Sequence, residues 1–238
     1  MKPCTVGIIG AQGHFGQSLC RRLGKAVNVV GSTDKSSNKV ISEQSDVLII
    51  AVRPDQVETV LKEIAPHLKP DARVVSFAAR YPLSSIEKIV QRPSARGMGD
   101  PDGNLCAYLC GDGLSLQEIE SLLPGLSRTK SMELRNDGEM NTYSVLLSHL
   151  LAVLQLEKLH RIDNAGEHLE FLAGAFSKFG RKVRVEEFRG YEFENTPEEA
   201  LKEFATPGGI TAKILVELQN RDTNPAEVYK KVMSSVFG

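Results

Sequence analysis

The chain of 238 residues contains no tryptophan, and only 6% of its residues are aromatic. It also lacks an excess of either charge, with 29 lysines and arginines against 30 aspartates and glutamates. Without a basic tail or stripe, binding to nucleic acid is not expected. The longest apolar stretch, 145–156, is interrupted by polar residues and is too short to span a bilayer, so no membrane partner is expected either.

Cysteine is scarce, and the four that are present form no CxxC pair and have no histidine at metal-ligand spacing. We interpret them as reduced thiols that serve as small core residues, and we expect no metal site. The N-terminus has no basic segment followed by a long apolar core, so we expect no signal peptide. We therefore expect a cytoplasmic location.

The most informative motif lies at the N-terminus. An apolar, β-rich run leads into Gly10, Gly13 and Gly16, and an amphipathic helix follows. Such a turn lets the backbone approach a pyrophosphate, and the helix N-terminus offers free N–H groups. The GxxGxxG spacing is looser than GxGxxG, and glycines alone also suit an ordinary tight turn, but the context favours a dinucleotide. The residues predicted to contact the cofactor here are Gly10, Gln12, Gly13, His14, Phe15 and Gly16.

The segment after the expected second strand bears on cofactor choice. Ser32, Thr33 and Lys35 offer hydroxyls and a cation, while Asp34 lies beyond the place where NAD-binding chains put an acid for the ribose. This favours NADP, with NAD still possible, and a solvated loop is the alternative interpretation.

Residues 1–135 alternate short apolar strands with helical patterns, which predicts an α/β, Rossmann-type domain of parallel βαβ units with ligands at the carboxyl ends of the strands. Residues 136–238 predict an all-α domain for substrate binding and dimerisation, in which 182–195 is expected to be irregular. Strands are expected at 27–31, 46–51, 73–76, 94–98, 105–110 and 130–134, and late helices at 138–160, 165–179, 197–204, 210–218 and 225–236.

Four segments resemble the pyrroline-5-carboxylate reductase family over nearly the whole chain. Residues 6–16 match its strand and glycine turn, and 45–57 match its D-V-(apolar)-A-V-K-P segment with Arg53 in place of the lysine. Residues 74–81 resemble its V-S-x-A-A-G segment with Arg80 in place of the glycine. Residues 204–218, with Thr-Pro-Gly-Gly-Ile-Thr, resemble its T-P-G-G-T-T loop. By this resemblance Ala51, Val52, Arg53 and Pro54 also border the cofactor.

The chain departs from the family on the substrate side. The R-x-M-P-N stretch reads Arg-Gly-Met-Gly-Asp at 96–100, the glycine- and serine-rich entry to the first long helix is missing, and Ile210 replaces the first threonine of the loop. His149, on an apolar helix, is expected to be a core histidine rather than a catalyst.

The resemblance implies an NADP-dependent oxidoreductase that reduces the C=N bond of 1-pyrroline-5-carboxylate to give proline, and an intertwined homodimer. Gly208 and Gly209 would bind the carboxylate of the small imino acid, and Thr211, the expected catalytic residue, would add a hydroxyl; a simple helix-opening turn is the alternative. Two other functions stay open: a catalytically silent NADP(H)-binding regulatory or redox-sensing module, and a dehydrogenase for another small imino or keto acid.

Overall fold

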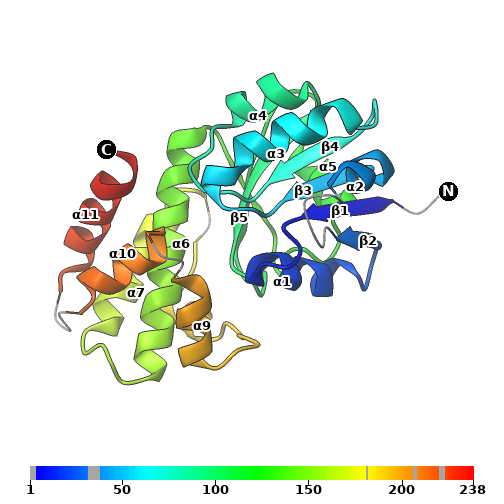
Figure 1. The fold of residues 1–238 in the computed structure, drawn as a ribbon. Helices are drawn as coiled ribbons and strands as arrows, with labels where there is room; N and C mark the ends of the chain where they lie inside the picture. The colour runs from blue at the N-terminus through cyan, green and yellow to red at the C-terminus, as the bar shows by residue number, and fades with distance from the viewer. Residues whose placement is uncertain (1–3, 32–37, 181, 206–207, 220–222) are drawn as a thin grey trace. The chain divides into compact units, whose positions relative to one another are not determined.

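The computed structural model describes residues 4–31, 38–180, 182–205, 208–219 and 223–238, without the side chains of residues 203 and 204. The chain divides into two compact units, Met1–Met140 and Asn141–Gly238. The first is an α/β unit and the second is built from helices (Figure 1). No helix in the described ranges has both the length and the apolar character needed to cross a membrane.

The first unit is built on a seven-stranded sheet in the order β2-β1-β3-β4-β5-β6-β7. Its first five strands run parallel to one another, because β1 pairs in parallel with both β2 and β3, and β4 continues the arrangement to β5. The strands are β1 (Thr5–Ile9), β2 (Asn28–Gly31), β3 (Val47–Ile50), β4 (Arg73–Ser76), β5 (Ser94–Gly99), β6 (Cys106–Cys110) and β7 (Met132–Leu134).

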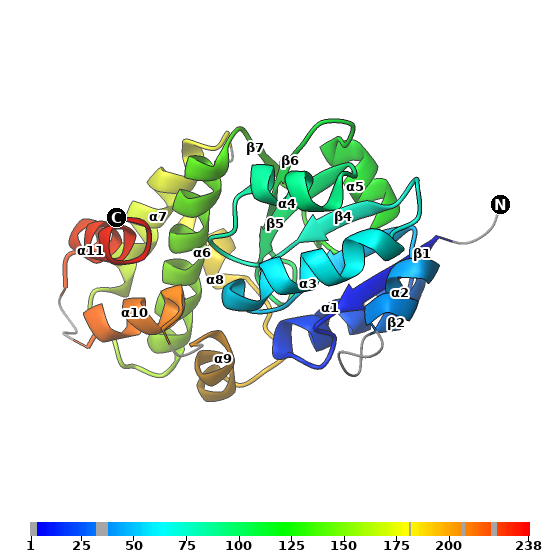
Figure 2. The ribbon, with the colours of Figure 1, turned by 45° about the horizontal axis from the view of Figure 1, so that its top comes forward.

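Helices cover both faces of the sheet (Figures 1 and 2). Alternate strand residues point to opposite faces, so Ile49 packs in the cluster under α1 and α5, whereas Leu48 and Ile50 pack in the cluster under α2, α3 and α4. The helices are α1 (His14–Leu23), α2 (Asn38–Gln44), α3 (Val57–Ile64), α4 (Leu83–Val90) and α5 (Leu116–Leu122). Short 3₁₀ turns, Pro54–Gln56 and Ala65–His67, flank α3.

The expectation that every strand belongs to a parallel βαβ unit is wrong at β5 and β6. These two strands pair antiparallel, and β7 pairs in parallel with β6. Only residues 100–105 separate β5 from β6, which is too short for a helical crossover of about a dozen residues. Asp100 shapes this connection, since its carboxylate accepts hydrogen bonds from the backbone N–H of Leu105 at 2.7 Å and from Asn104 Nδ2 at 2.9 Å.

The second unit contains most of the long helix α6 (Asp137–Lys158), followed by α7 (Ala165–Ser177), α8 (Val185–Arg189), α9 (Pro197–Phe204), α10 (Ile210–Glu217) and α11 (Pro225–Phe237). The helix α8 corrects the expectation that 182–195 is irregular. Phe188 stands among polar residues in the sequence, yet its side chain is fully buried and packs against Phe176 with ring centroids 5.8 Å apart. That single buried ring fixes one face of the short helix.

A buried histidine pair joins α6 to α7. Nε2 of His149 lies 2.8 Å from Nδ1 of His168, and Nε2 of His168 lies 2.9 Å from the carbonyl oxygen of Thr223. Because a carbonyl only accepts, His168 donates through Nε2 and accepts through Nδ1, and His149 therefore donates through Nε2. Both rings are fully buried, and burial lowers the pKa of both; that of His149 falls to about 3. His149 is a core histidine in this structure.

This pair predicts a loss of stability in acid. Between the ordinary histidine pKa of about 6.5 and the folded value of about 3, the unfolded chain binds a proton at residue 149 that the folded chain does not. The free energy of unfolding should therefore fall by up to about 1.4 kcal/mol per pH unit as the pH drops below about 6.5. Urea unfolding followed by circular dichroism at a series of pH values measures this slope. A free energy of unfolding that is constant or rises from pH 7 to pH 4 contradicts the assignment.

Candidate functional site

The candidate site lies at the carboxyl edge of the sheet, where β1 ends beside β3. The chain leaves β1 toward β2 and returns on the other side to β3, so this edge is a topological switch point, where open α/β sheets bind their ligands. Gly10 turns the chain here with φ of +88°, which favours glycine. A Cβ atom on Gly10 would lie 2.5 Å from the carbonyl oxygen of Ala51, so only glycine lets the two turns approach this closely.

The N-terminus of α1 faces outward from the same edge. Gly13 is its N-cap residue, and its N–H donates to the carbonyl of Gly10 at 3.0 Å. Gly16 is buried, and a Cβ there would lie 2.2 Å from the same carbonyl oxygen, so Gly16 sets the packing of helix on turn. Gln12, Gly13 and His14 are exposed, and Phe15 is half-buried. The first turn of α1 carries no acidic residue, so nothing there repels a phosphate.

The turn after β3 carries the second group of predicted cofactor residues. The N–H of Ala51 donates to the carbonyl of Ile9 at 2.9 Å, which holds this turn beside the end of β1. Val52 and Pro54 are half-buried, and Arg53 is exposed and forms an ion pair with Asp55 at 3.4 Å. The structure thus brings Gly10–Gly16 and 51–54 to one edge.

Sequence reasoning missed Phe77, which follows β4 at this edge. Its N–H donates to the carbonyl of Ile50 at 2.9 Å, and its ring centroid lies 5.2 Å from that of Phe15 and 6.0 Å from that of Tyr108. A Cβ on Gly97 of β5 would lie 2.6 Å from the Phe77 ring. The glycine inside strand β5 was the available signal that a large ring packs closely on that strand.

Two charged residues of the stretch 96–100 are buried and held by interactions within the first unit. Arg96 is 2% exposed and is ion-paired with Asp137 in the first turn of α6, whose carboxylate also accepts the N–H of Leu83 at 3.4 Å. Asp100, which stands where the family has asparagine, is 1% exposed, and its carboxylate is hydrogen-bonded within its own connection. Its side chain is therefore committed to the connection between β5 and β6.

The remaining predicted residues fall elsewhere. Ser32, Thr33 and Lys35 lie outside the described residues, as does Pro207. Gly208, with φ of +72°, and Gly209, the N-cap residue, open α10 in the second unit. Thr211 is 7% exposed and lies in the first turn of the same helix. That first turn contains no acidic residue.

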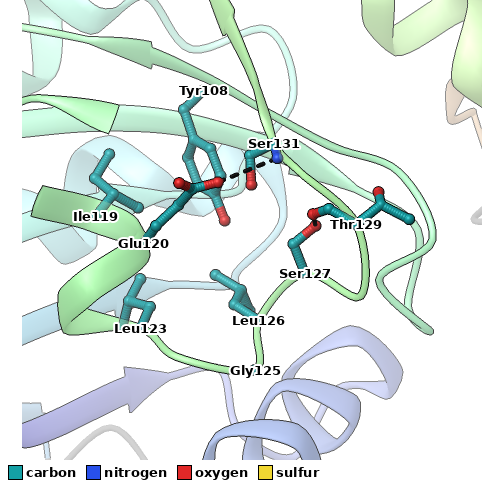
Figure 3. A pocket seen from close by; sticks show the side chains of 9 residues that line it. All are labelled: Tyr108, Ile119, Glu120, Leu123, Gly125, Leu126, Ser127, Thr129 and Ser131. Carbon is teal, nitrogen blue, oxygen red and sulfur yellow. Dashed lines mark hydrogen bonds between the residues drawn. The ribbon is translucent and has the colours of Figure 1, made fainter. Parts of the chain in front are cut away.

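A small pocket of about 130 Å³ lies away from this edge, between β6, α5 and the segment that leads to β7 (Figure 3). Glu120 accepts a hydrogen bond from the backbone N–H of Ser131 at 3.1 Å at its rim, and Tyr108 forms its inner wall. A volume of this size holds a few water molecules at about 30 Å³ each but no dinucleotide. The pocket is therefore separate from the candidate cofactor site.

Known proteins resemble the chain in sequence and in fold. Pyrroline-5-carboxylate reductase of Methanosarcina acetivorans is 35% identical over 85 residues, which are 36% of this chain and 29% of that protein. The enzyme of the same name from Pseudomonas aeruginosa is 35% identical over 57 residues, or 24% of this chain and 21% of that protein. The aligned segments thus span less than a third of these curated relatives. No protein-family model matches the chain.

Solved structures extend the likeness to nearly the whole chain. A 1-pyrroline-5-carboxylate reductase from Streptococcus pyogenes has a TM-score of 0.55 at 16% identity, covering 97% of this chain and 96% of that one. The Plasmodium falciparum pyrroline carboxylate reductase with NADP bound has a TM-score of 0.54 at 16% identity, covering 99% of this chain and 95% of that one. The chain thus resembles the pyrroline-5-carboxylate reductases in part of its sequence and in its fold. The fold of this chain has a Rossmann-type sheet in its first unit and helices in its second.

The surroundings of Gly13 and Gly16 allow a test of whether the cofactor binds at this edge of the sheet. The nearest contact of a Cβ on Gly13 would be the carbonyl oxygen of Gly10 at 3.4 Å, and the φ of −71° suits any residue, so Gly13→Val should fold normally. It should nevertheless abolish NADPH binding, because the branched side chain occupies the space that the pyrophosphate needs. Calorimetry with NADPH and thermal unfolding measure the two effects.

Gly16→Ala is the matched contrast. Its Cβ would collide with the backbone of the turn itself, so this variant should lose stability as well as affinity. Full NADPH affinity in Gly13→Val would show that the cofactor does not approach this turn.

Proposed function

We propose that the chain is an NADP-dependent oxidoreductase that reduces the C=N bond of a small cyclic imino acid, with 1-pyrroline-5-carboxylate as the substrate and proline as the product. The observation that carries the proposal is the junction of Gly10 with the turn after β3 at the switch point, in a chain whose fold is that of the pyrroline-5-carboxylate reductases. The first unit is the cofactor domain and the second provides substrate binding.

The residues at the edge fit a dinucleotide. The backbone from Gly10 to Gly13 and the first turn of α1 hold the pyrophosphate, because helical geometry leaves the first N–H groups without intrahelical acceptors. The backbone of 51–54 borders the next part of the cofactor. Ser32, Thr33 and Lys35 favour NADP over NAD on sequence grounds.

Reduction of a cyclic imine requires few acid–base groups from the protein. NADPH supplies a hydride when bound, and a cyclic imine takes its proton readily from water. The protein's task is to bind the carboxylate and hold the C=N carbon in place. The N–H groups at Gly208 and Gly209 serve the carboxylate, since they open α10 and no acid lies in its first turn. The Thr211 hydroxyl adds a further hydrogen bond.

Replacing this hydroxyl tests the substrate site. Thr211→Val preserves side-chain shape and removes one hydrogen bond to a charged or polar group, worth about 1.5–3 kcal/mol. The value of kcat/KM for 1-pyrroline-5-carboxylate should fall roughly ten- to a hundredfold while the Kd for NADPH stays unchanged.

The control for this variant is Thr59→Val, which makes the same change at an exposed position of α3 and should leave both values at wild-type level. An unchanged kcat/KM in Thr211→Val would remove Thr211 from the site.

A silent NADP(H)-binding module is the second candidate. It is favoured by the commitment of Asp100 to its own connection, because the family's asparagine at this place is then not replaced by an available side chain. NADPH binding without turnover of any small imino or keto acid by the purified chain would establish this module in place of the reductase.

The chain also forms a homodimer through its second unit. The expected source of that contact, the apolar stretch 145–156, is buried within the chain itself except at half-buried Ser148, because the surrounding helices cover it. The apolar surface that remains includes Val216 on α10, which is 60% exposed, and a hollow of about 540 Å³ between α6, α7 and α11 lined by Leu146, Phe171 and Tyr229. Two-fold pairing is the commonest way to cover such a surface.

Two exposed valines provide a matched test of the dimer. Val216→Glu places a charge in the proposed contact and should convert the dimer to a monomer, because an unpaired buried charge is costly. Val40→Glu makes the same change at a 50% exposed valine of the first unit and should leave the dimer intact. Light scattering at concentrations well above micromolar measures both, and a monomeric wild-type chain under those conditions refutes the assembly.

A further inference from the structure

We propose that the pocket between β6, α5 and the segment that leads to β7 binds a short-chain primary amine in its protonated form. All the residues that line this pocket belong to the first unit, and the pocket lies away from the candidate cofactor site (Figure 3). The amine site therefore goes beyond the proposed function and does not depend on it.

A buried hydroxyl in the pocket is left for a ligand. Ser131 is 4% exposed, and its backbone N–H donates to Glu120. In the part of the chain that the structure describes, its Oγ atom has no hydrogen-bond partner. Figure 3 shows this hydroxyl pointing inward, between Tyr108 and Ser127. Because a buried polar group is costly when it stays unpaired, a ligand that bonds to Ser131 makes an interaction that the fold itself does not supply.

Two other hydroxyls of the lining can only accept. Ser127 Oγ donates its proton to the carbonyl oxygen of Thr129, and Thr129 Oγ1 donates to the carbonyl oxygen of Asn104 at 2.8 Å. A hydroxyl has one proton to donate and two lone pairs that accept, so both oxygens offer only lone pairs to a ligand. The ligand must therefore supply the hydrogen-bond donors.

The charge of the lining favours a cation. Among the described residues that line the pocket, the one charged side chain is Glu120. Its carboxylate accepts the N–H of Ser131 at 3.1 Å, which occupies one of about four lone-pair positions. The two cations of the neighbouring loop, Arg128 and Lys130, are exposed and do not line the pocket. A primary ammonium brings three donors and a positive charge, and it binds a carboxylate through charge-assisted hydrogen bonds.

The volume and the apolar walls set the size of the ligand. The pocket measures about 130 Å³, which corresponds to about four non-hydrogen atoms at about 30 Å³ each. Ile119, Leu123 and Leu126 supply apolar wall and are buried. Tyr108 is fixed as the inner wall, because its ring packs on Phe77 with centroids 6.0 Å apart. A preformed pocket with apolar walls and a few polar groups accommodates an amine with a short alkyl chain, such as propylamine.

The test compares three ligands of similar size that differ in their polar group. Propylammonium, 1-propanol and propionate are titrated into the full chain at pH 7, and the amide resonances of residues that line the pocket report binding by NMR. The Kd for propylammonium should be lower than that for 1-propanol by about tenfold or more, because only the ammonium pairs its charge with Glu120. Propionate should produce no saturable shift.

Two variants assign the binding to the pocket. Glu120→Gln keeps an acceptor for the N–H of Ser131 but removes the charge, so the Kd for propylammonium should rise about tenfold while that for 1-propanol stays unchanged. Ser131→Ala should also weaken propylammonium binding about tenfold. It should not lower Tm, since the hydroxyl makes no hydrogen bond with the described residues. The control is Glu133→Gln, at an exposed glutamate of β7 outside the lining, which should leave the Kd unchanged.

The contrary outcomes are distinct. Equal Kd values for propylammonium and 1-propanol, or unchanged propylammonium binding in Glu120→Gln, would overturn the role of the carboxylate. Absence of saturable propylammonium binding would show that the pocket holds water only. NADPH should not displace propylammonium, and displacement would place the amine at the cofactor edge and overturn the site as well. None of these measurements involves imine reduction, so the amine site and the reductase can fail separately.

Discussion

The closeness of the turns after β1 and β3 is the constraint on which the rest of the first unit depends. Gly10 has to accept a left-handed backbone and to lie against the carbonyl of Ala51, and Gly16 has to admit the same turn beneath the first helix. A methyl group at Gly10 would push the turns after β1 and β3 apart, and one at Gly16 would push α1 away from the turn after β1. The contact fixes where α1 points, and with it the cluster of N–H groups to which we assign cofactor binding.

The neighbouring parts of the edge are fixed by other means. Phe77 is held between Phe15 and Tyr108, and it needs a glycine at position 97 to cross β5. The connection after β5 is held by the Asp100 carboxylate and is tied to α1, where Arg22 Nη1 donates to the carbonyl of Pro101 at 2.9 Å. Rigid packing around an exposed rim is the arrangement that holds a ligand in a defined orientation.

Much of this fold could be predicted from the sequence, because most of its elements have a local signal. The glycine turn, β4 and α9 follow from apolar runs, turn residues and a proline-led helix start, and Arg73–Ser76 and Pro197–Phe204 were predicted with the bounds that the structure shows. A strand at 105–110 was also predicted, but the antiparallel direction of β6 was not, since strand direction depends on the partner across the sheet rather than on the strand's own residues. Helix α8 escaped prediction because tertiary burial of Phe188, not periodicity, stabilises it.

Only part of the candidate site could be predicted from the sequence. The residues of 10–16 and 51–54 were found from motif and resemblance, and the structure places them at one edge. Phe77 was missed, because nothing local distinguishes it from a core residue. Arg80 could be seen as a departure from the family motif, but its left-handed backbone, with φ of +64°, required the structure.

Transfer of isotope tests the central claim most directly. The purified chain would be given NADPH that carries deuterium at the transferable position of C4, together with the cyclic imines, and the products would be analysed by mass spectrometry. The account predicts one deuterium on the former C=N carbon of the cyclic amino acid product. Bound NADPH with no deuterium in any product would contradict it.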